Sequence, residues 1–499
     1  MAKAIMIQGT MSNAGKSLLA AGLCRIFKQD GYRVAPFKSQ NMALNSYITS
    51  EGLEMGRAQV VQAQAAGCEP SVDMNPILLK PSSDVGSQVI VRGVPIGTMP
   101  AKEYFKYKKQ LIPEIKKAFQ HLSEQYDIIV IEGAGSPAEI NLKSDDIVNM
   151  GMARMAGAPV LLAGDIDRGG VFAQLYGTVA LLEPDEQAMV KGLIINKFRG
   201  DVEILRPGLT QLEDLTGKPV IGVVPYGYFD IDDEDSLSER LDAKAAPALV
   251  NIAVVKLPRL SNFTDFSALS RVSGVSVAYA DKPAQLAGAD LIILPGTKST
   301  LADLRWLRES GMEAQILKAY AAGTPVFGIC GGYQMMGRTV SDPDNTEGGG
   351  SLRGMKLLPI DTVFRPSKTT TQTRGTLLEI DGVLSDLSGL AVEGYEIHMG
   401  ETVRDASAKP LVRLLRREGE IEDGCQTENA FGTYLHGVFD APEAALRTAQ
   451  ALAKKKGVTL TGEALDTHAY KEQQYDKLAD SVRKSLDMEW IYRIMEGKA

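Results

Sequence analysis

The stretch FGICGGYQMMG, residues 327–337, places an apolar strand, a cysteine next to glycines and helix-forming residues in direct succession. Glycine accepts the strained backbone of a strand-to-helix turn, and such a turn presents a nucleophile at its apex. A helix N-terminus favours a thiolate placed beside it. A free cysteine is also often a buried structural residue, so partners elsewhere in the chain must decide the role of Cys330.

Outward from this stretch, strand-length apolar runs alternate with helix-length amphipathic segments. Continuous apolar strands that alternate with helices indicate parallel sheets covered on both faces. The first set of runs ends near residue 225, and strand signals restart at residue 250. The expected strands are residues 4–8, 34–37, 128–132, 159–163, 192–196 and 220–224, then 250–256, 291–294 and 325–329, with a helical pattern over 104–125.

The remaining patterns predict how the chain is divided. Residues 229–249 are rich in acidic residues and poor in apolar side chains, which predicts a linker or an exposed helix between domains. Alternating runs after the loop at 342–351 indicate antiparallel strands that end near 434–439, and the chain then becomes helical over 444–456 and 470–495. We expect two α/β domains and a helical C-terminal extension, with the boundaries 1–228, 229–249 (linker), 250–443 and 444–499.

Composition excludes several classes of protein. The 499 residues are 44% hydrophobic and 23% charged, with a net charge of −8, which is typical of a soluble protein of two or three domains and not of a nucleic-acid binder. Its four cysteines lie far apart, which argues against a disulfide framework or a zinc site. The chain starts without a leader pattern and has no apolar run near the ~20 residues of a membrane span. We expect a cytoplasmic protein without a membrane partner; the oligomeric state stays open.

A phosphate-binding loop follows the first strand. Residues 9–17 read GTMSNAGKS and lead into a helix, although five residues separate Gly9 from Gly15, one more than in the common P-loop. Backbone N–H groups of such a loop surround a phosphate, the lysine contacts the β/γ-phosphates and the hydroxyl binds magnesium. The alternative is an ordinary glycine-rich turn. The predicted ATP-binding residues are Thr10, Asn13, Ala14, Gly15, Lys16 and Ser17.

Polar side chains gather where the other strands of this half end, which is where open α/β sheets bind ligands. Glu132 ends a strongly apolar strand, so its carboxylate and the Ser17 hydroxyl are the predicted magnesium ligands. Asn196 is expected near the adenine of ATP. The predicted acceptor-binding residues at the other strand ends are Lys38, Asn41, Asp165, Asp167 and Arg168. Each of them could alternatively be an ordinary surface residue. Glu54 is a possible second magnesium ligand.

A catalytic Cys330 requires a base and an oxyanion hole. His436, in FGTYLHGVFD, is the expected base and His398, in GYEIHMG, is its competitor, whereas the other two histidines lie in helical patterns. The expected oxyanion donors are the backbone N–H groups of Gly331 and of the LPGTKST loop, near Gly296 and Thr297.

These motifs carry a family resemblance. The LPGT loop, the GICGG turn and the late histidine resemble class I glutamine amidotransferases, and the long phosphate loop with EGAG at 132–135 resembles dethiobiotin synthetase. Together, in this order and over nearly the whole chain, they resemble the cobyrinate-amidating enzymes, most closely the cobyric acid synthases. The segments that look like that family's signatures include EMGRAQVVQAQAA (54–66), GDIDRGGVFAQ (164–174), INKFRGD (195–201), RLSNFTDF (259–266) and GYEIHMG (394–400).

The resemblance implies a function. It implies amidation, dependent on ATP, Mg²⁺ and glutamine, of a corrinoid, adenosylcobyrinic acid a,c-diamide, at carboxylates b, d, e and g, to give adenosylcobyric acid in cobalamin biosynthesis. Class I enzymes usually carry a glutamate two residues after the histidine, but Val438 stands there, so we expect a Cys–His dyad. The alternatives are a,c-diamide synthase, a cell-wall lipid amidotransferase, and a regulatory P-loop NTPase with an inactive glutaminase-like module. The sequence KSQNMALNSY at 38–47 differs from the GPDYIDP-like segment of a,c-diamide synthases and favours the later enzyme.

Overall fold

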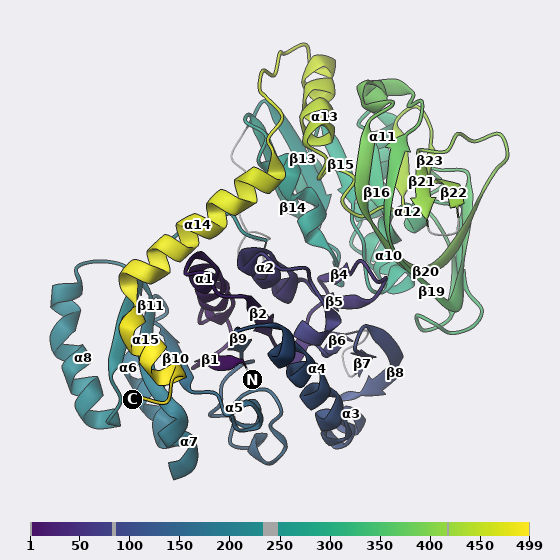
Figure 1. Cartoon of the computed structure of the whole chain (residues 1–499). Helices are drawn as coiled ribbons and strands as arrows, with labels where there is room; N and C mark the ends of the chain where they lie inside the picture. The colour runs from purple at the N-terminus through teal and green to yellow at the C-terminus, as the bar shows by residue number, and fades with distance from the viewer. Residues whose placement is uncertain (1, 82–85, 233–247, 417–418, 499) are drawn as a thin grey trace. The chain divides into compact units, whose positions relative to one another are not determined.

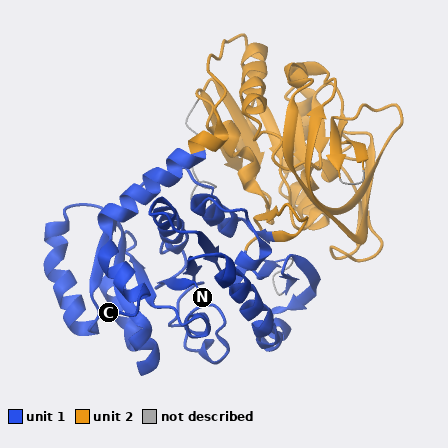
Figure 2. Ribbon diagram, in the orientation of Figure 1, with its two compact units in different colours: residues 1–42, 55–232, 471–499 blue, residues 43–54, 233–470 orange. Residues whose placement is uncertain are grey.

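The computed structural model describes residues 2–81, 86–232, 248–416 and 419–498. Two compact units form, and each is assembled from separate stretches of chain (Figure 2). Unit 1 comprises residues 1–42, 55–232 and 471–499, and unit 2 comprises residues 43–54 and 233–470.

Unit 1 is built on a six-stranded parallel sheet, with the strand order β12-β11-β10-β1-β9-β2. Figure 1 labels β1, β2, β9, β10 and β11 of this sheet. Its strands are β1 (Lys3–Gly9), β2 (Val34–Phe37), β9 (Ile128–Glu132), β10 (Val160–Asp165), β11 (Val190–Phe198) and β12 (Val220–Pro225). These strands are mostly buried along their length, as their unbroken apolar runs require. A smaller sheet has the order β3 (Gln40–Met42), β6 (Ile77–Pro81), β7 (Gly86–Val91) and β8 (Val94–Pro100).

The C-terminal helices complete the core of unit 1. Apolar side chains of α14 (Thr467–Ser485) and α15 (Met488–Met495) share one buried cluster with the sheet and with α1 (Lys16–Gln29) and α2 (Arg57–Ala66). Gly222 of β12 makes this packing close, since a Cβ there would lie 2.2 Å from the carbonyl oxygen of Ser485. The other helices of unit 1 are α3 (Ala101–Tyr107), α4 (Ile112–Gln125), α5 (Met150–Ala156), α6 (Val171–Ala180), α7 (Pro184–Met189) and α8 (Val202–Thr216).

Unit 2 also has a central sheet, with the order β14-β13-β15-β16-β24-β23, parallel except for the last pair. Its strands are β13 (Val250–Val255), β14 (Val275–Ala280), β15 (Leu291–Leu294), β16 (Val326–Ile329), β23 (Cys425–Gln426) and β24 (Ala430–Thr433). Its helices are α9 (Ser267–Ser270), α10 (Thr300–Glu309), α11 (Met312–Ala321), α12 (Gly331–Met335) and α13 (Pro442–Lys455).

A second sheet of unit 2 is largely antiparallel, and the long hairpin of β19 and β20 dominates it. It contains β17 (Thr339–Asp342), β18 (Gly350–Arg353), β19 (Ile360–Leu377), β20 (Ala391–Arg404), β21 (Val412–Arg416) and β22 (Gly419–Asp423). Residues 43–54, with β4 (Ser46–Ile48), pack against β19 and β20 although they stand among residues of unit 1 in the sequence. β5 (Glu54–Gly56) follows them.

The expected fold class, two α/β domains with C-terminal helices, is confirmed. The strands expected to end near 434–439 end slightly earlier, because β24 ends at Thr433 and turns follow it. The helical pattern at 104–125 is divided between α3, a short 3₁₀ turn and α4. Residues 233–247 of the expected linker lie outside the described residues, and the expected domain boundaries remain predictions. No helix in the described parts of the chain is long and apolar enough to cross a membrane.

Candidate active sites

The phosphate loop of unit 1 connects β1 to α1. Asn13 and Gly15 have φ values of 62° and 90°, and this left-handed backbone turns the chain into the helix. Lys16 Nζ donates hydrogen bonds to the carbonyl oxygens of Met11 and Gly135, at 2.9 and 3.1 Å, which holds its charge over the loop. Thr10 Oγ1 donates to Gln174 Oε1 at 3.1 Å. The loop thus has the form that an anionic phosphate requires.

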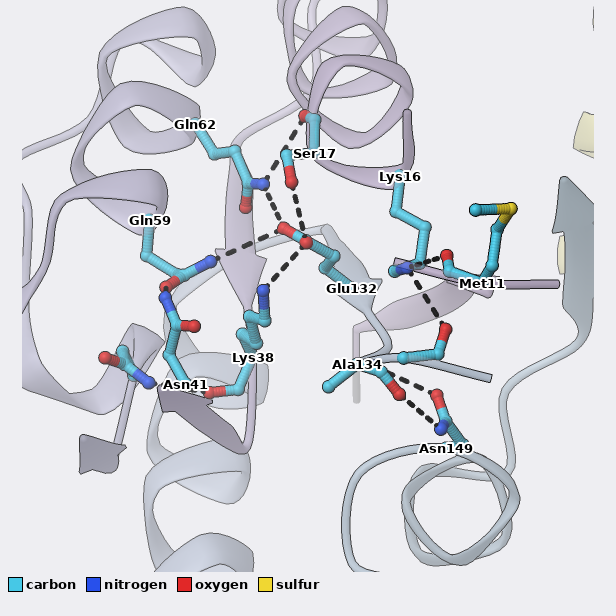
Figure 3. Close-up of polar contacts among 12 residues, drawn as sticks. Met11, Lys16, Ser17, Lys38, Asn41, Gln59, Gln62, Glu132, Ala134 and Asn149 are labelled. Carbon is cyan, nitrogen blue, oxygen red and sulfur yellow. Dashed lines mark hydrogen bonds and ion pairs between the residues drawn. The ribbon is translucent and has the colours of Figure 1, made fainter. Parts of the chain in front are cut away.

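Glu132 is the centre of a buried polar network beside this loop (Figure 3). Its Oε1 accepts hydrogen bonds from Ser17 Oγ at 2.8 Å and from Lys38 Nζ at 2.9 Å. Its Oε2 accepts from Gln62 Nε2 at 2.5 Å and from Gln59 Nε2 at 3.5 Å. The structure therefore brings together both predicted magnesium ligands, whose hard oxygen atoms fit Mg²⁺ in the presence of phosphate oxygens.

Two other predicted residues support this region. Asn196, at the end of β11, donates from Nδ2 to the carbonyl oxygen of Ala14 at 2.8 Å, so its amide contacts the phosphate loop itself. Asn41 Nδ2 donates to Gln59 Oε1 at 3.2 Å and thereby orders one of the glutamines next to Glu132. Lys38 and Asn41, which were predicted to bind the acceptor, thus both belong to the Glu132 network.

The other predicted acceptor residues form a separate group after β10. Asp165 is fully buried, and its Oδ2 lies 2.9 Å from Lys197 Nζ and 3.8 Å from Arg168 Nε. Asp167 Oδ1 lies 2.8 Å from Arg199 Nε. Arg168 has a side chain that is 50% exposed, so its charge remains accessible to an anionic ligand.

In unit 2, Cys330 stands at a strained turn between β16 and α12. Its φ and ψ are 52° and −109°, an unusual backbone for a residue with a side chain. The adjacent glycines are required sterically, since a Cβ at Gly332 would lie 1.9 Å from the carbonyl oxygen of Leu294. This is the strand–turn–helix geometry that the sequence predicts for a nucleophile.

His436 is buried, and it pairs with Asp265, which is not among the residues predicted from the sequence. Its Nδ1 lies 2.7 Å from Asp265 Oδ2, and its Nε2 has no hydrogen-bond partner within the described residues. Burial by itself lowers the pKa of His436, but Asp265 and Cys330 outweigh it and raise that pKa from 6.5 to about 10. Asp265 therefore supplies a carboxylate contact to the imidazole of the expected Cys–His dyad, a contact that Val438 cannot make.

The predicted oxyanion donors lie beside the cysteine and the histidine. A Cβ at Gly296 would lie 3.2 Å from His436 Cε1, and a Cβ at Gly331 would lie 3.1 Å from the backbone nitrogen of Thr297. The Thr297 side chain is fixed by its hydroxyl, which donates to Asp303 Oδ2 at 2.5 Å. Gly296, Thr297 and Gly331 therefore lie close together, beside His436 and next to Cys330.

His398, the competing base, is held by other groups. Its ring stacks on Tyr434 with centroids 3.7 Å apart, and its Nδ1 lies 2.9 Å from the Gly400 carbonyl oxygen. Glu396 accepts two hydrogen bonds from the Arg416 guanidinium. Burial favours the neutral acid, but His398 and Arg416 outweigh it and lower the pKa of Glu396. This geometry favours His436 as the base.

Glu54, the possible second magnesium ligand, pairs with Lys368 within unit 2, at 2.5 Å.

Gln59, Gln62 and Asp265 were not predicted as site residues, although each lies in a segment that resembles a family signature. Gln59 and Gln62 lie three residues apart on one face of α2, in a signature segment that gave no role for them. Asp265 lies in RLSNFTDF, but 171 residues separate it from His436. Only the fold brings these pairs together.

Comparison with known proteins assigns a family to each half of the chain. Residues 251–444 match the model of a CobB/CobQ-like glutamine amidotransferase domain, and residues 5–233 match that of a CobQ/CobB/MinD/ParA nucleotide binding domain. Cobyric acid synthase of Lachnoclostridium phytofermentans is 60% identical over 99% of both chains. The chain belongs to the cobyric acid synthase family. The enzymes of that name from Ruminiclostridium cellulolyticum and Citrobacter koseri are 59% and 53% identical, again over 99% of this chain and 98% and 99% of theirs.

Membership of this family confirms the enzyme class. The chain is a glutamine-dependent amidoligase with a nucleotide-binding domain and a glutamine amidotransferase domain. Membership of this family therefore argues against the alternative of a regulatory NTPase with an inactive glutaminase-like module.

Proposed function

We propose that this enzyme amidates adenosylcobyrinic acid a,c-diamide at its b, d, e and g carboxylates, with ATP and glutamine, and forms adenosylcobyric acid. The observation that carries the proposal is the buried Cys330–His436–Asp265 arrangement in a chain that also contains a complete phosphate loop. The names of the relatives support the corrinoid as the substrate class.

The first half-reaction releases ammonia at unit 2. The Cys330 thiolate attacks the side-chain amide carbon of glutamine, and backbone N–H groups near Gly331, Gly296 and Thr297 stabilise the oxyanion. His436 takes the proton of the Cys330 thiol and gives it to the leaving nitrogen, and Asp265 stabilises the imidazolium between these two transfers. Water then hydrolyses the glutamyl thioester, which yields glutamate and restores the thiol.

The second half-reaction activates the acceptor at unit 1. A carboxylate oxygen of the acceptor attacks the γ-phosphorus of ATP, and ADP leaves. Ammonia then attacks the carbonyl carbon of the acyl phosphate, displaces phosphate and loses a proton to give the amide. Lys16, the loop N–H groups and Asn196 hold the nucleotide and the charge of the transferred phosphoryl group. Ser17 and Glu132 would hold Mg²⁺, which neutralises charge on the phosphate oxygens when it is bound.

We further propose that Arg168, with Asp165 and Asp167, contacts the acceptor, whereas Lys38 and Asn41 act beside the phosphates. Arg168 carries an accessible charge next to the end of β10, the usual ligand edge of such a sheet. The variant Arg168→Glu should raise the KM for the corrinoid and leave glutamine hydrolysis unchanged. An unchanged KM would exclude this contact.

The decisive experiment compares the wild type with Cys330→Ala in ATP-dependent amidation of adenosylcobyrinic acid a,c-diamide, with either glutamine or ammonium as the nitrogen source. We expect the variant to fail with glutamine and to work with ammonium. Activity of the variant with glutamine would refute the role of Cys330. A wild type that amidates only cobyrinic acid would instead identify an a,c-diamide synthase.

A further inference from the structure

Residues 43–54 form part of the glutaminase unit although they stand within the nucleotide-binding half of the sequence. The nucleotide-binding model matches residues 5–233, which include them, yet they belong to unit 2. They are anchored firmly there, because Ile48 is fully buried against Tyr395 and Ile397 and Glu54 pairs with Lys368. We refer to residues 43–54 as the inserted segment.

The backbone of one residue in the inserted segment holds two side chains that flank the catalytic histidine. Ser46 N donates to Asn262 Oδ1 at 3.2 Å, and the Ser46 carbonyl oxygen accepts from the Tyr395 hydroxyl at 3.2 Å. The Tyr395 ring stacks on the imidazole of His436, with centroids 5.1 Å apart and planes at 12°. Asn262 Nδ2 lies 3.5 Å from His436 Nδ1, on the same edge as Asp265.

The backbones of these residues are also paired. Tyr395 N donates to the His436 carbonyl oxygen at 3.2 Å, and His436 N donates to that of Tyr395 at 2.9 Å. Because the ring and the backbone of Tyr395 both contact His436, a displacement of Tyr395 changes the orientation of the imidazole. Ser46 fixes the far end of the Tyr395 side chain.

Both ends of the inserted segment continue into the network around Glu132. Lys38 and Asn41 stand five and two residues before it, and Gln59 and Gln62 stand five and eight residues after it. Three of these four side chains donate to Glu132, and Asn41 donates to Gln59. A ligand that rearranges this network therefore acts on the two chain ends between which Ser46 is held.

We propose that the inserted segment positions His436 through Tyr395 and Asn262, and that it thereby makes glutamine hydrolysis respond to ligands in the nucleotide site. Tyr395 is a positioning residue in this arrangement. The inference rests on the proposed function of Cys330 and His436.

The test uses the full chain and the variant Tyr395→Phe, which removes only the hydroxyl that contacts Ser46. Its matched control is Tyr47→Phe, which removes the hydroxyl that Gln372 Nε2 contacts at 2.8 Å, on the same segment. Glutamine hydrolysis is measured with and without ATP and adenosylcobyrinic acid a,c-diamide, and ammonium-supported amidation is measured in parallel.

We expect Tyr395→Phe to lower kcat for glutamine hydrolysis in the presence of ATP and the corrinoid by about fivefold to tenfold. A change of this size corresponds to the loss of one hydrogen bond. The KM for glutamine and the ammonium-supported activity should stay within twofold, and Tyr47→Phe should match the wild type. An unchanged kcat and stimulation in Tyr395→Phe, or an equal loss in Tyr47→Phe, would overturn the proposal.

Two further variants separate the possible failures. If Tyr395→Phe also loses ammonium-supported activity, the second variant to test is Asn262→Gly. Glycine accepts the φ of 52° at that position, so this variant removes only the side chain. The proposal then requires that ATP and the corrinoid no longer stimulate glutamine hydrolysis in Asn262→Gly. If Cys330→Ala and His436→Ala retain glutamine hydrolysis, the proposed function itself fails. If these two lose it while Tyr395→Phe behaves as the wild type, only the inference fails.

Discussion

Replacement of Asp265 by asparagine removes the carboxylate that faces His436 Nδ1 and keeps the size of the side chain. The two side chains are 4% and 1% exposed, so solvent screens their interaction little. The rise of the His436 pKa from 6.5 to about 10 corresponds to roughly 5 kcal/mol in favour of the imidazolium, at about 1.4 kcal/mol for each tenfold change. Removal of one partner of a buried charge pair typically costs ~3–5 kcal/mol. Since Cys330 still interacts with the imidazole, we expect kcat for glutamine hydrolysis to fall about 100- to 1000-fold.

The pH dependence gives a second readout of the same pair. A raised pKa stabilises the folded protein fully below the ordinary value of 6.5, and this contribution is lost as the pH rises through about 10. In Asp265→Asn the pKa of His436 falls, so the difference in unfolding free energy from the wild type should be largest below about pH 6.5, decrease as the pH rises and vanish above about pH 10. The alkaline limb of glutamine hydrolysis should move to lower pH.

The assay measures glutamate release between pH 6 and 11, and ammonium-supported amidation reports whether the rest of the enzyme is intact. Asp290→Asn is the matched control, because Asp290 accepts from Asn251 N and pairs with Lys456 in the same unit. If Asp265→Asn hydrolyses glutamine within threefold of the wild type and keeps its alkaline limb, the assignment of Asp265 is refuted.

Two further predictions concern unit 1. The variant Glu132→Gln loses the charge that holds Lys38 and would hold Mg²⁺. Ammonium-supported amidation should therefore fall by about 100-fold or more, while unstimulated glutamine hydrolysis changes little. Amidation at the wild-type rate would exclude this role of Glu132. The variant Gly222→Ala should lower the free energy of unfolding by ~1–3 kcal/mol, because its Cβ meets the Ser485 carbonyl oxygen and forces the C-terminal helices away. Urea unfolding checks this against Gly177→Ala, where a Cβ has no atom within 4 Å and where an equal loss would contradict the reasoning.

The fold could be predicted where local sequence determines local structure. The strands at 34–37, 128–132 and 291–294 begin and end as their apolar runs predict, because a fully buried strand must be apolar on both faces. The assembly of the units could not be predicted in this way. The amphipathic pattern of α14 and α15 indicates helices with an apolar face, but it does not specify which sheet that face covers. The inserted segment is short and mixed in composition, so nothing in it identifies unit 2 as its place.

The candidate sites also contain parts that could be predicted from local sequence and parts that could not. Gly15, Lys16 and Ser17 are adjacent in the sequence, and so are Gly331 and Cys330, so one local backbone conformation creates each geometry. Pairs formed across the fold were missed, because 171 residues separate Asp265 from His436 and 70 separate Gln62 from Glu132. Lys38 is predicted to bind the acceptor because it ends a strand, and its ammonium group contacts the carboxylate predicted to bind Mg²⁺.

That contact has a consequence for ligand binding. Both oxygens of Glu132 already accept hydrogen bonds, from Ser17, Lys38 and the two glutamines, and a cation bound at this carboxylate must displace some of these donors. Lys38 is the first candidate, because its ammonium group would be repelled by the metal and attracted by the phosphates that accompany it. Lys38 stands five residues before the inserted segment, and Gln59 and Gln62 stand shortly after it. We therefore expect that binding of the metal–nucleotide complex reorganises both flanks of the segment that fixes Tyr395, which would limit ammonia release to the state in which a carboxylate can be activated.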